Sequence, residues 1–181
     1  ITQVNNYTNS FINELKDTNA YSDEKESDNV FAITSKKKTL QEILKIYADE
    51  VAAKGINPAS GGHIGYIPGG GIYTAAIADY LADVTNEYSG MYFASPGAVT
   101  MENELIDWMK SIFGFPKTAI GNLTSGGSIA TLIALTSARD KHGIKNANIE
   151  KSVIYLSEQV HHCINKALRI IGLEDVIIRY I

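Results

Sequence analysis

The chain has 181 residues, of which 45% are hydrophobic, and its formal net charge is −4. This length and composition are typical of a globular protein with a substantial core, organised as one domain or one and a part. The negative charge argues against nucleic acid as a partner, because phosphate backbones require clustered lysines and arginines.

Cysteine content and hydropathy exclude further classes. The only cysteine, Cys163, leaves no internal disulfide and no cysteine-rich metal site, so we expect no metal and a reducing compartment, the cytoplasm. No apolar run reaches the roughly 18 to 20 residues that cross a bilayer, so a membrane is not an expected partner. The sequence begins with isoleucine and ends in the β-rich run 176–181, and we therefore expect it to be the N-terminal part of a longer, truncated subunit.

The sequence up to Asn86 predicts helices. Residues 1–38 are polar and predict a short helix followed by a polar connector, to which no site is assigned. Thr39-Leu-Gln-Glu42 has the form of a capping box, and apolar residues at helical spacing continue to Gly55. A second helical pattern runs from Tyr73 to Asn86.

Between these two helices lies a segment rich in glycine and proline, from Asn57 to Gly71. Such a loop lets the backbone approach a ligand closely, and a plain linker between helices is an equal alternative. His63 lies in this loop, but one histidine without a second ligand is a poor metal site.

The segment from Met101 to Phe113 predicts another helix, preceded by an aromatic loop. Its apolar side is expected to be buried. The residues of this stripe are Leu105, Trp108, Met109 and Ile112. The apolar sides of the helices predicted up to Phe113 need a partner surface, either the rest of the chain or a second subunit.

After Thr118 the pattern changes to alternating helix and strand. It predicts helices over 128–140 and 158–171, and strands over 152–156 and 176–181. This alternation indicates an α/β fold with a parallel sheet and right-handed crossovers. Because ligands bind at the carboxyl ends of such strands, this edge of the sheet is the expected site.

The stretch Gly121-Asn-Leu-Thr-Ser-Gly-Gly-Ser128 opens onto the first of these helices. Backbone amides, hydroxyls and the positive end of the helix converge there, which suits a phosphate. The spacing matches neither a Walker loop nor a dinucleotide-binding turn. From these residues alone, an ordinary loop that caps a helix remains the alternative.

Five motifs in order resemble the pyridoxal-phosphate-dependent amino-acid decarboxylases of the aromatic-amino-acid and glutamate decarboxylase group. The resemblance runs from about Leu40 to the end. The motifs are His63-Ile-Gly-Tyr-Ile-Pro-Gly-Gly-Gly71, Phe93-Ala-Ser-Pro-Gly-Ala98, Met101-Glu-Asn-Glu-Leu-Ile-Asp-Trp108, Thr124-Ser-Gly-Gly-Ser128 and Gln159-Val-His161.

The resemblance implies a fold-type I, transferase-like architecture. Residues 39–100 would then be a helical dimerisation segment, and residues 101–181 the first part of the cofactor-binding large domain. The complete subunit would form a homodimer with its active site at the subunit boundary. The segment 1–181 alone is expected to aggregate or stay partly unfolded, and to be inactive.

The resemblance also assigns site residues. It implies that Gly126, Gly127 and Ser128 hold the phosphate of pyridoxal 5'-phosphate. His161 would lie over the pyridine ring as the catalytic residue of this part. Tyr66 and Gly69 would contribute to the pocket of the amino-acid substrate.

The sequence departs from the family at Ile129, where glutamate is frequent, so a hydrogen bond from that glutamate is missing. The family's Schiff-base lysine and the aspartate that pairs with the pyridine nitrogen would lie beyond residue 181. The expected function is decarboxylation of an amino acid to its amine and carbon dioxide. The alternatives are a non-catalytic fragment or pseudoenzyme that acts in association, and another fold-type I reaction such as transamination.

Overall fold

A computed structural model describes residues 1–25 and 27–181. The chain forms two compact units, Ile1–Asn86 and Glu87–Ile181, and each is described by itself. Within the described residues, no helix combines the length and apolar character that spanning a membrane requires.

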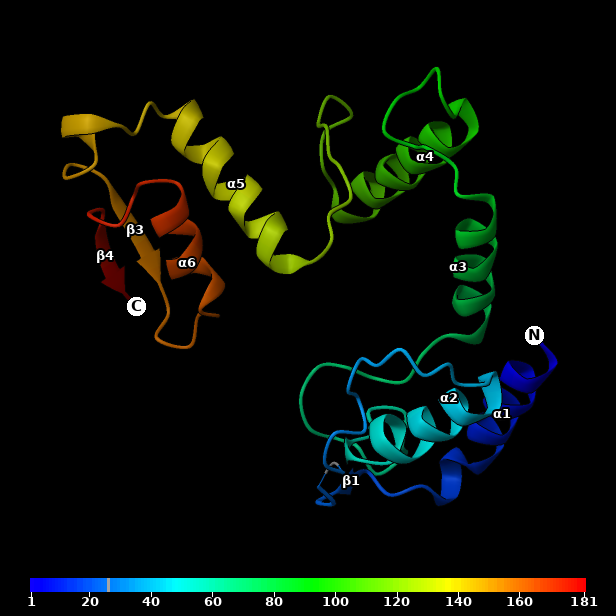
Figure 1. Cartoon of the computed structure of the whole chain (residues 1–181). Helices are drawn as coiled ribbons and strands as arrows, with labels where there is room; N and C mark the ends of the chain where they lie inside the picture. Colours follow the sequence, from blue (N-terminus) through cyan, green and yellow to red (C-terminus); the bar gives the residue numbers. More distant parts are fainter. Residues whose placement is uncertain (26) are drawn as a thin grey trace. The chain divides into compact units, whose positions relative to one another are not determined.

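The first unit is mainly helical (Figure 1). Its α-helices are α1 (Thr2–Glu14), α2 (Leu40–Ile46) and α3 (Tyr73–Thr85), with a 3-10 turn η1 (Leu15–Asp17), a π-helical segment η2 (Tyr47–Ala52) and the strands β1 (Tyr21–Ser22) and β2 (Gly55–Ile56). Helices α1 and α2 pack together, and the rings of Tyr7 and Tyr47 meet edge to face with centroids 5.8 Å apart.

The predicted capping box at the start of α2 is confirmed. The Thr39 hydroxyl accepts the amide hydrogen of Glu42 at 3.2 Å, and the Glu42 carboxylate accepts that of Thr39 at 2.6 Å. The predicted helix is regular only to Ile46, and the turns that follow it are π-helical.

The polar connector is more ordered than its composition predicts. Strand β1 pairs antiparallel with β2, so that Tyr21 lies opposite Ile56. Just before the strand, the carbonyl of Thr18 accepts a hydrogen bond from the Ser60 hydroxyl at 2.6 Å, and the carbonyl of Ala20 accepts one from the Asn57 amide at 3.0 Å. The N-terminal segment therefore holds the start of the glycine-rich loop.

The carboxylate of Glu50, in the π-helical segment η2, links this segment to the polar connector. The Glu50 carboxylate accepts hydrogen bonds from Lys54 Nζ at 2.6 Å and from the amide and hydroxyl of Ser27 at 3.0 and 2.8 Å. The Glu50 and Lys54 side chains are only 12% and 14% exposed. The Lys54 hydrogen bond, followed by those from Ser27, lowers the pKa of Glu50 to about 2.

We expect this carboxylate to make the first unit sensitive to acid. Its folded pKa of about 2 lies below the value of roughly 4.3 in an unfolded chain. The stabilisation is therefore complete above about pH 5 and is lost as the pH falls towards 2. Melting temperatures of the complete protein between pH 7 and pH 3 should fall less steeply in Glu50→Gln than in wild type. Equal slopes would contradict this assignment, and Glu24→Gln, on the exposed connector, is the control.

The second unit carries the α/β part of the fold. Its elements are α4 (Pro96–Phe113), α5 (Gly127–Lys141), a 3-10 turn η3 (Asn146–Asn148), β3 (Val153–Leu156), α6 (Cys163–Ile170) and β4 (Ile177–Tyr180). Helix α4 begins five residues before its predicted start, because Pro96 occupies its first position. Proline suits this position, since the amide hydrogen that it lacks would have no partner in the helix there and its φ is already helical.

Strands β3 and β4 are parallel, with Val153 opposite Ile177 and Leu156 opposite Tyr180. Helix α6 connects them and packs on α5. The buried centre of this unit is formed by Leu168, Leu173 and Val176, supported by apolar residues of α5 and both strands. This arrangement confirms the predicted strand, helix and parallel strand. In Figure 1 the arrowheads of β3 and β4 and the starts of α5 and α6 lie at the same end of the unit.

Two expectations were wrong. Helix α6 begins at Cys163, not at residue 158, because a turn in which Ser157 accepts from the Val160 amide precedes it. The apolar stripe of α4 is exposed, not buried. Leu105, Trp108, Met109 and Ile112 are 43%, 58%, 40% and 56% exposed.

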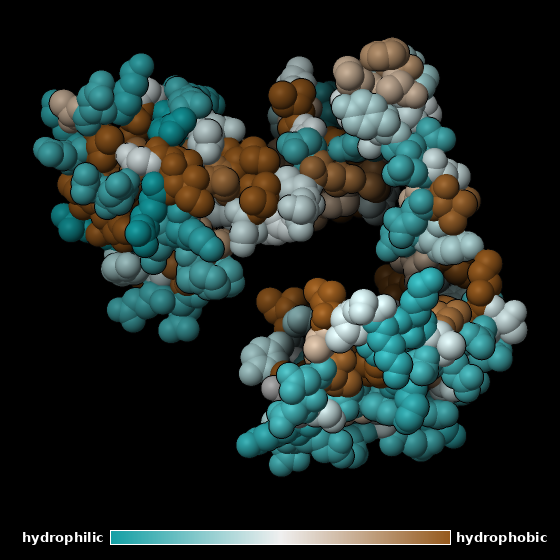
Figure 2. All heavy atoms as spheres, viewed as in Figure 1, coloured by the Kyte–Doolittle hydropathy of each residue, from teal (hydrophilic) through white to brown (hydrophobic). Residues whose placement is uncertain are grey.

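The α3 stripe is similarly uncovered, since Ile77, Tyr80, Leu81 and Val84 are 51% to 64% exposed. Figure 2 shows hydrophobic side chains at the surface along both helices. Helical spacing places these residues on one side of each helix, but it does not say which surface covers that side.

Candidate cofactor site

The glycine turn before α5 has a defined shape. Gly126 precedes the helix with φ +154°, a region that favours glycine because it lacks a Cβ atom. Its carbonyl accepts hydrogen bonds from the amides of Ile129 and Ala130, both at 3.1 Å, and from the Thr124 hydroxyl at 3.1 Å. Thr124 was not assigned a role from the sequence, although a hydroxyl two residues before a glycine turn is a usable signal.

The amides of Gly127 and Ser128 occupy the first two helical positions, where no carbonyl of the helix can accept from them. No side chain caps this helix, and no acceptor for either amide is found in the part of the chain that the structure describes. A Cβ atom built at Gly127 meets nothing within 4 Å. Open amides at the positive end of a 15-residue helix fit a phosphate group.

Ile129 stands where glutamate is frequent in the resembling family. Its side chain is 43% exposed, and its amide bonds to Gly126. No carboxylate therefore stands at this position to make the hydrogen bond expected of that glutamate.

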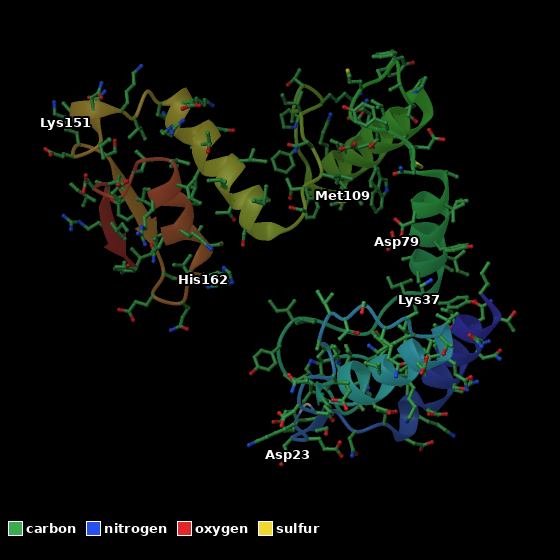
Figure 3. All side chains as sticks on the ribbon, in the orientation of Figure 1. Asp23, Lys37, Asp79, Met109, Lys151 and His162 are labelled. Carbon is green, nitrogen blue, oxygen red and sulfur yellow. The ribbon has the colours of Figure 1, made fainter. Side chains whose placement is uncertain are left out.

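His161 lies in the connection from β3 to α6, and its side chain is exposed. Its Nδ1 accepts a hydrogen bond from the Cys163 amide at 3.2 Å. In the neutral imidazole, an accepting Nδ1 leaves the proton on Nε2. His162 lies alongside, with ring centroids 4.1 Å apart and planes tilted by 35°, and Figure 3 labels it at the start of α6. His161 thus caps a helix, which leaves Nε2 as a possible donor.

The starts of α5 and α6 lie close together. The Cys163 thiol approaches the Thr131 hydroxyl at 4.0 Å, and Thr131 is one helical turn, about 6 Å, beyond Gly127. Nearby, the Ile181 amide donates to the carbonyl of Leu156 at the end of β3. The glycine turn and His161 are therefore at the carboxyl edge of the sheet, where the sequence places them. The Cys163–Thr131 contact has no signal in the sequence.

Tyr66 and Gly69 belong to the first unit. Tyr66 has φ +62° and is 85% exposed, and its ring stacks on that of His63 with centroids 6.5 Å apart and planes 16° from parallel. A Cβ atom at Gly69 meets nothing within 4 Å, so this chain gives no steric reason for glycine there.

The described ranges, 1–25 and 27–181, contain no group of three or more histidine, cysteine, aspartate or glutamate side chains that could hold a metal ion. The groups described at this edge of the sheet are backbone amides, hydroxyls, imidazoles and the Cys163 thiol.

A family comparison defines the class. Residues 24–181 match the family described as "Pyridoxal-dependent decarboxylase conserved domain", and the chain belongs to this family. The cofactor of this family is pyridoxal 5'-phosphate, and the open amides of the glycine turn fit the phosphate of that group.

Individual relatives support this membership. The chain is 39% identical over 109 residues to an aromatic-L-amino-acid decarboxylase of Bacillus atrophaeus, covering 60% of this chain and 22% of the relative. It is 31% identical over 119 residues to tyrosine decarboxylase 4 of Petroselinum crispum, covering 60% and 23%. The chain therefore spans less than a quarter of the length of these relatives.

Solved structures share the fold. A tryptophan decarboxylase of Catharanthus roseus in complex with L-tryptophan matches with a TM-score of 0.84 and 19% identity, over 99% of this chain and 41% of that one. An Oryza sativa TDC with PLP and tryptamine also matches with a TM-score of 0.84 and 19% identity, over 99% and 40%. This likeness confirms the predicted fold class.

Proposed function

We propose that the complete protein uses pyridoxal 5'-phosphate to decarboxylate an amino acid with an aromatic side chain, giving the amine and carbon dioxide. The observation that carries this proposal is the family match over residues 24–181, together with the open amides of the glycine turn within it. The names of the curated relatives support an aromatic substrate. The single cysteine supports a cytoplasmic location.

The glycine turn holds the cofactor in this proposal. The amides of Gly127 and Ser128 and the Ser128 hydroxyl would bind the phosphate, and the positive end of α5 would favour its negative charge. Gly126 gives the turn its shape. The bound cofactor supplies an electron sink for the charge left when carbon dioxide departs.

His161 orients the reacting groups. The imidazole of His161 would lie against the cofactor, and the hydrogen bond that its Nδ1 accepts from the Cys163 amide fixes the orientation of the imidazole. An imidazole held in this way would limit the orientations open to the substrate when carbon dioxide departs. Tyr66 and Gly69 bind the substrate.

A second candidate is an aldehyde-forming reaction with the same cofactor. Phenylacetaldehyde synthase of Petunia hybrida is 29% identical over 117 residues, and 4-hydroxyphenylacetaldehyde synthase of Rhodiola rosea shares the fold with a TM-score of 0.82. Products formed from tyrosine and tryptophan by the complete protein with the cofactor distinguish the two reactions. Decarboxylation gives amine without aldehyde. Aldehyde as the main product would establish the second reaction, and cofactor binding without any product would establish the pseudoenzyme.

We also propose that the complete protein is a homodimer in which a second copy covers the exposed stripes of α3 and α4. The four stripe residues of each helix are all 40% or more exposed, and exposed apolar surface of this kind marks interfaces. Trp108, at 58% exposed, is the largest side chain of the α4 stripe.

Light scattering tests the dimer. The wild-type protein should have the mass of two subunits, and Trp108→Glu should dissociate or aggregate, because it places a charge in an apolar contact. Asn103→Glu, on the same helix and also exposed, adds the same charge outside the stripe and should stay dimeric. A wild-type mass of one subunit would rule out the interface.

A further inference from the structure

The loop from Asn57 to Tyr66 contains three unfavourable features that the fold of this chain does not explain. In the described part of the chain, His63 Nε2 and Asn57 Nδ2 are buried atoms without a hydrogen-bond partner. Tyr66 has a left-handed backbone conformation, with φ +62°. Unpaired buried polar atoms and strained residues concentrate at functional sites, so this loop is a candidate for one.

The strain at Tyr66 is notable because glycine is abundant around it. Gly65 and the run 69–71 show that the loop readily uses residues without a side chain, yet tyrosine occupies the left-handed position. Its side chain is 85% exposed, so burial does not hold it there. The contact that the structure shows for its ring is the near-parallel stack on His63.

His63 is itself anchored. Its amide donates to the carbonyl of Ser60 at 3.0 Å, and Ser60 is only 5% exposed. The Ser60 hydroxyl donates to the carbonyl of Thr18 at 2.6 Å and accepts the Gly62 amide hydrogen at 3.3 Å. A continuous set of contacts thus runs from the N-terminal segment through Ser60 and His63 to the ring of Tyr66.

We propose that His63 is a positioning residue that holds Tyr66 in its left-handed conformation, so that the tyrosine ring forms a flat wall for the side chain of an aromatic substrate. This inference rests on the proposed function. A wall that is already fixed costs less to order when the substrate binds, and a flat ring pairs best with another flat ring. His63 acts through Tyr66 and does not itself contact the substrate.

A double-mutant cycle tests the coupling in the complete protein loaded with cofactor. Two quantities are measured, the KM for tyrosine and the calorimetric Kd for tyramine, which needs no turnover. His63→Ala should raise both about three- to tenfold and leave kcat unchanged, because the ring stack is lost. His63→Phe keeps a flat ring and should stay close to wild type.

The decisive comparison is made in the Tyr66→Ala background. There, His63→Ala should have no further effect on either quantity, because the residue through which His63 acts is gone. An equal effect in both backgrounds would overturn the positioning role. If the wild-type protein releases no carbon dioxide, the proposed function fails, while the tyramine Kd still decides the role of His63.

The strain has its own test, which is independent of catalysis. In an ordinary loop, alanine gives a more stable protein than glycine, because glycine has more freedom in the unfolded chain. At a left-handed position the order reverses. Tyr66→Gly should therefore melt at a higher temperature than Tyr66→Ala. The opposite order would show that Tyr66 is unstrained and would overturn the proposal.

Discussion

Replacing Gly127 with aspartate should weaken the binding of pyridoxal 5'-phosphate by about 10²-fold or more. The new carboxylate would stand at the first position of α5, within a few ångströms of the phosphate that the open amides are proposed to bind. Two like charges about 4 Å apart near a protein surface repel by about 4 kcal/mol, which corresponds to a loss of this size. Titration of the cofactor-free complete protein with pyridoxal 5'-phosphate measures the effect.

Loss of folding does not account for such a result. Acidic residues in the first turn of a helix stabilise it, so Gly127→Asp should keep or raise the melting temperature of the cofactor-free protein. Gly127→Ala is the matched control. A Cβ atom there meets nothing within 4 Å, so this variant should bind the cofactor almost as wild type does. Unchanged affinity in Gly127→Asp would remove the phosphate from this turn.

His161→Ala should reduce turnover by about 10²-fold or more, whereas His162→Ala should have little effect. The first change removes the ring proposed to lie over the cofactor, and loss of a group that orients reactants has a cost of this order. The centroids of the two rings are only 4.1 Å apart. A difference between the two variants would therefore show that turnover depends on the position of the His161 ring and not on any histidine ring nearby. Equal losses in both would mean that the wrong histidine has been assigned. Steady-state rates with tyrosine provide the comparison.

The helix cap at His161 requires a further control. Because Nδ1 accepts the Cys163 amide hydrogen, His161→Ala also removes a cap, which typically costs about 1 kcal/mol. Asparagine can accept from the amide two residues on, so His161→Asn should restore the melting temperature without the flat ring. Turnover should stay low in His161→Asn. Recovery of both properties would reduce His161 to a capping residue.

Local patterns in the sequence predict much of the fold. The capping box at Thr39 is made by residues three positions apart, so it is readable without tertiary information. The parallel pairing of β3 and β4 follows from two short apolar runs separated by a helix, since that connection leaves little choice of topology.

The features that were not predicted depend on contacts distant in sequence or on single backbone angles. The pairing of Tyr21 with Ile56 involves strands of two residues each, too short for a periodic signal. Helix α6 begins late because the Val160 amide donates to the Ser157 carbonyl in a turn, and the Cys163 amide donates to the His161 side chain. The left-handed conformation of Tyr66 opposes its residue preference, and sequence rules assign that conformation to glycine or asparagine.

The same distinction between local sequence patterns and other information applies to the candidate site. The glycine turn is predictable because adjacent glycines before an apolar helix leave amides open, and the structure contains such a turn at Gly126. The role of His161 comes from family resemblance, because a histidine after a strand has no unique chemistry. The geometry of His161 is compatible with a capping role, since its Nδ1 accepts from the Cys163 amide, and with a ring that lies over the cofactor.

The most direct test of the central claim is release of labelled carbon dioxide from carboxyl-labelled tyrosine or tryptophan by the complete protein, before and after removal of pyridoxal 5'-phosphate. Carbon dioxide equal in amount to the amine, lost when the cofactor is removed and regained when it is restored, is the predicted result. Release that persists without the cofactor, or no release from either amino acid while the cofactor is bound, would contradict the proposed function.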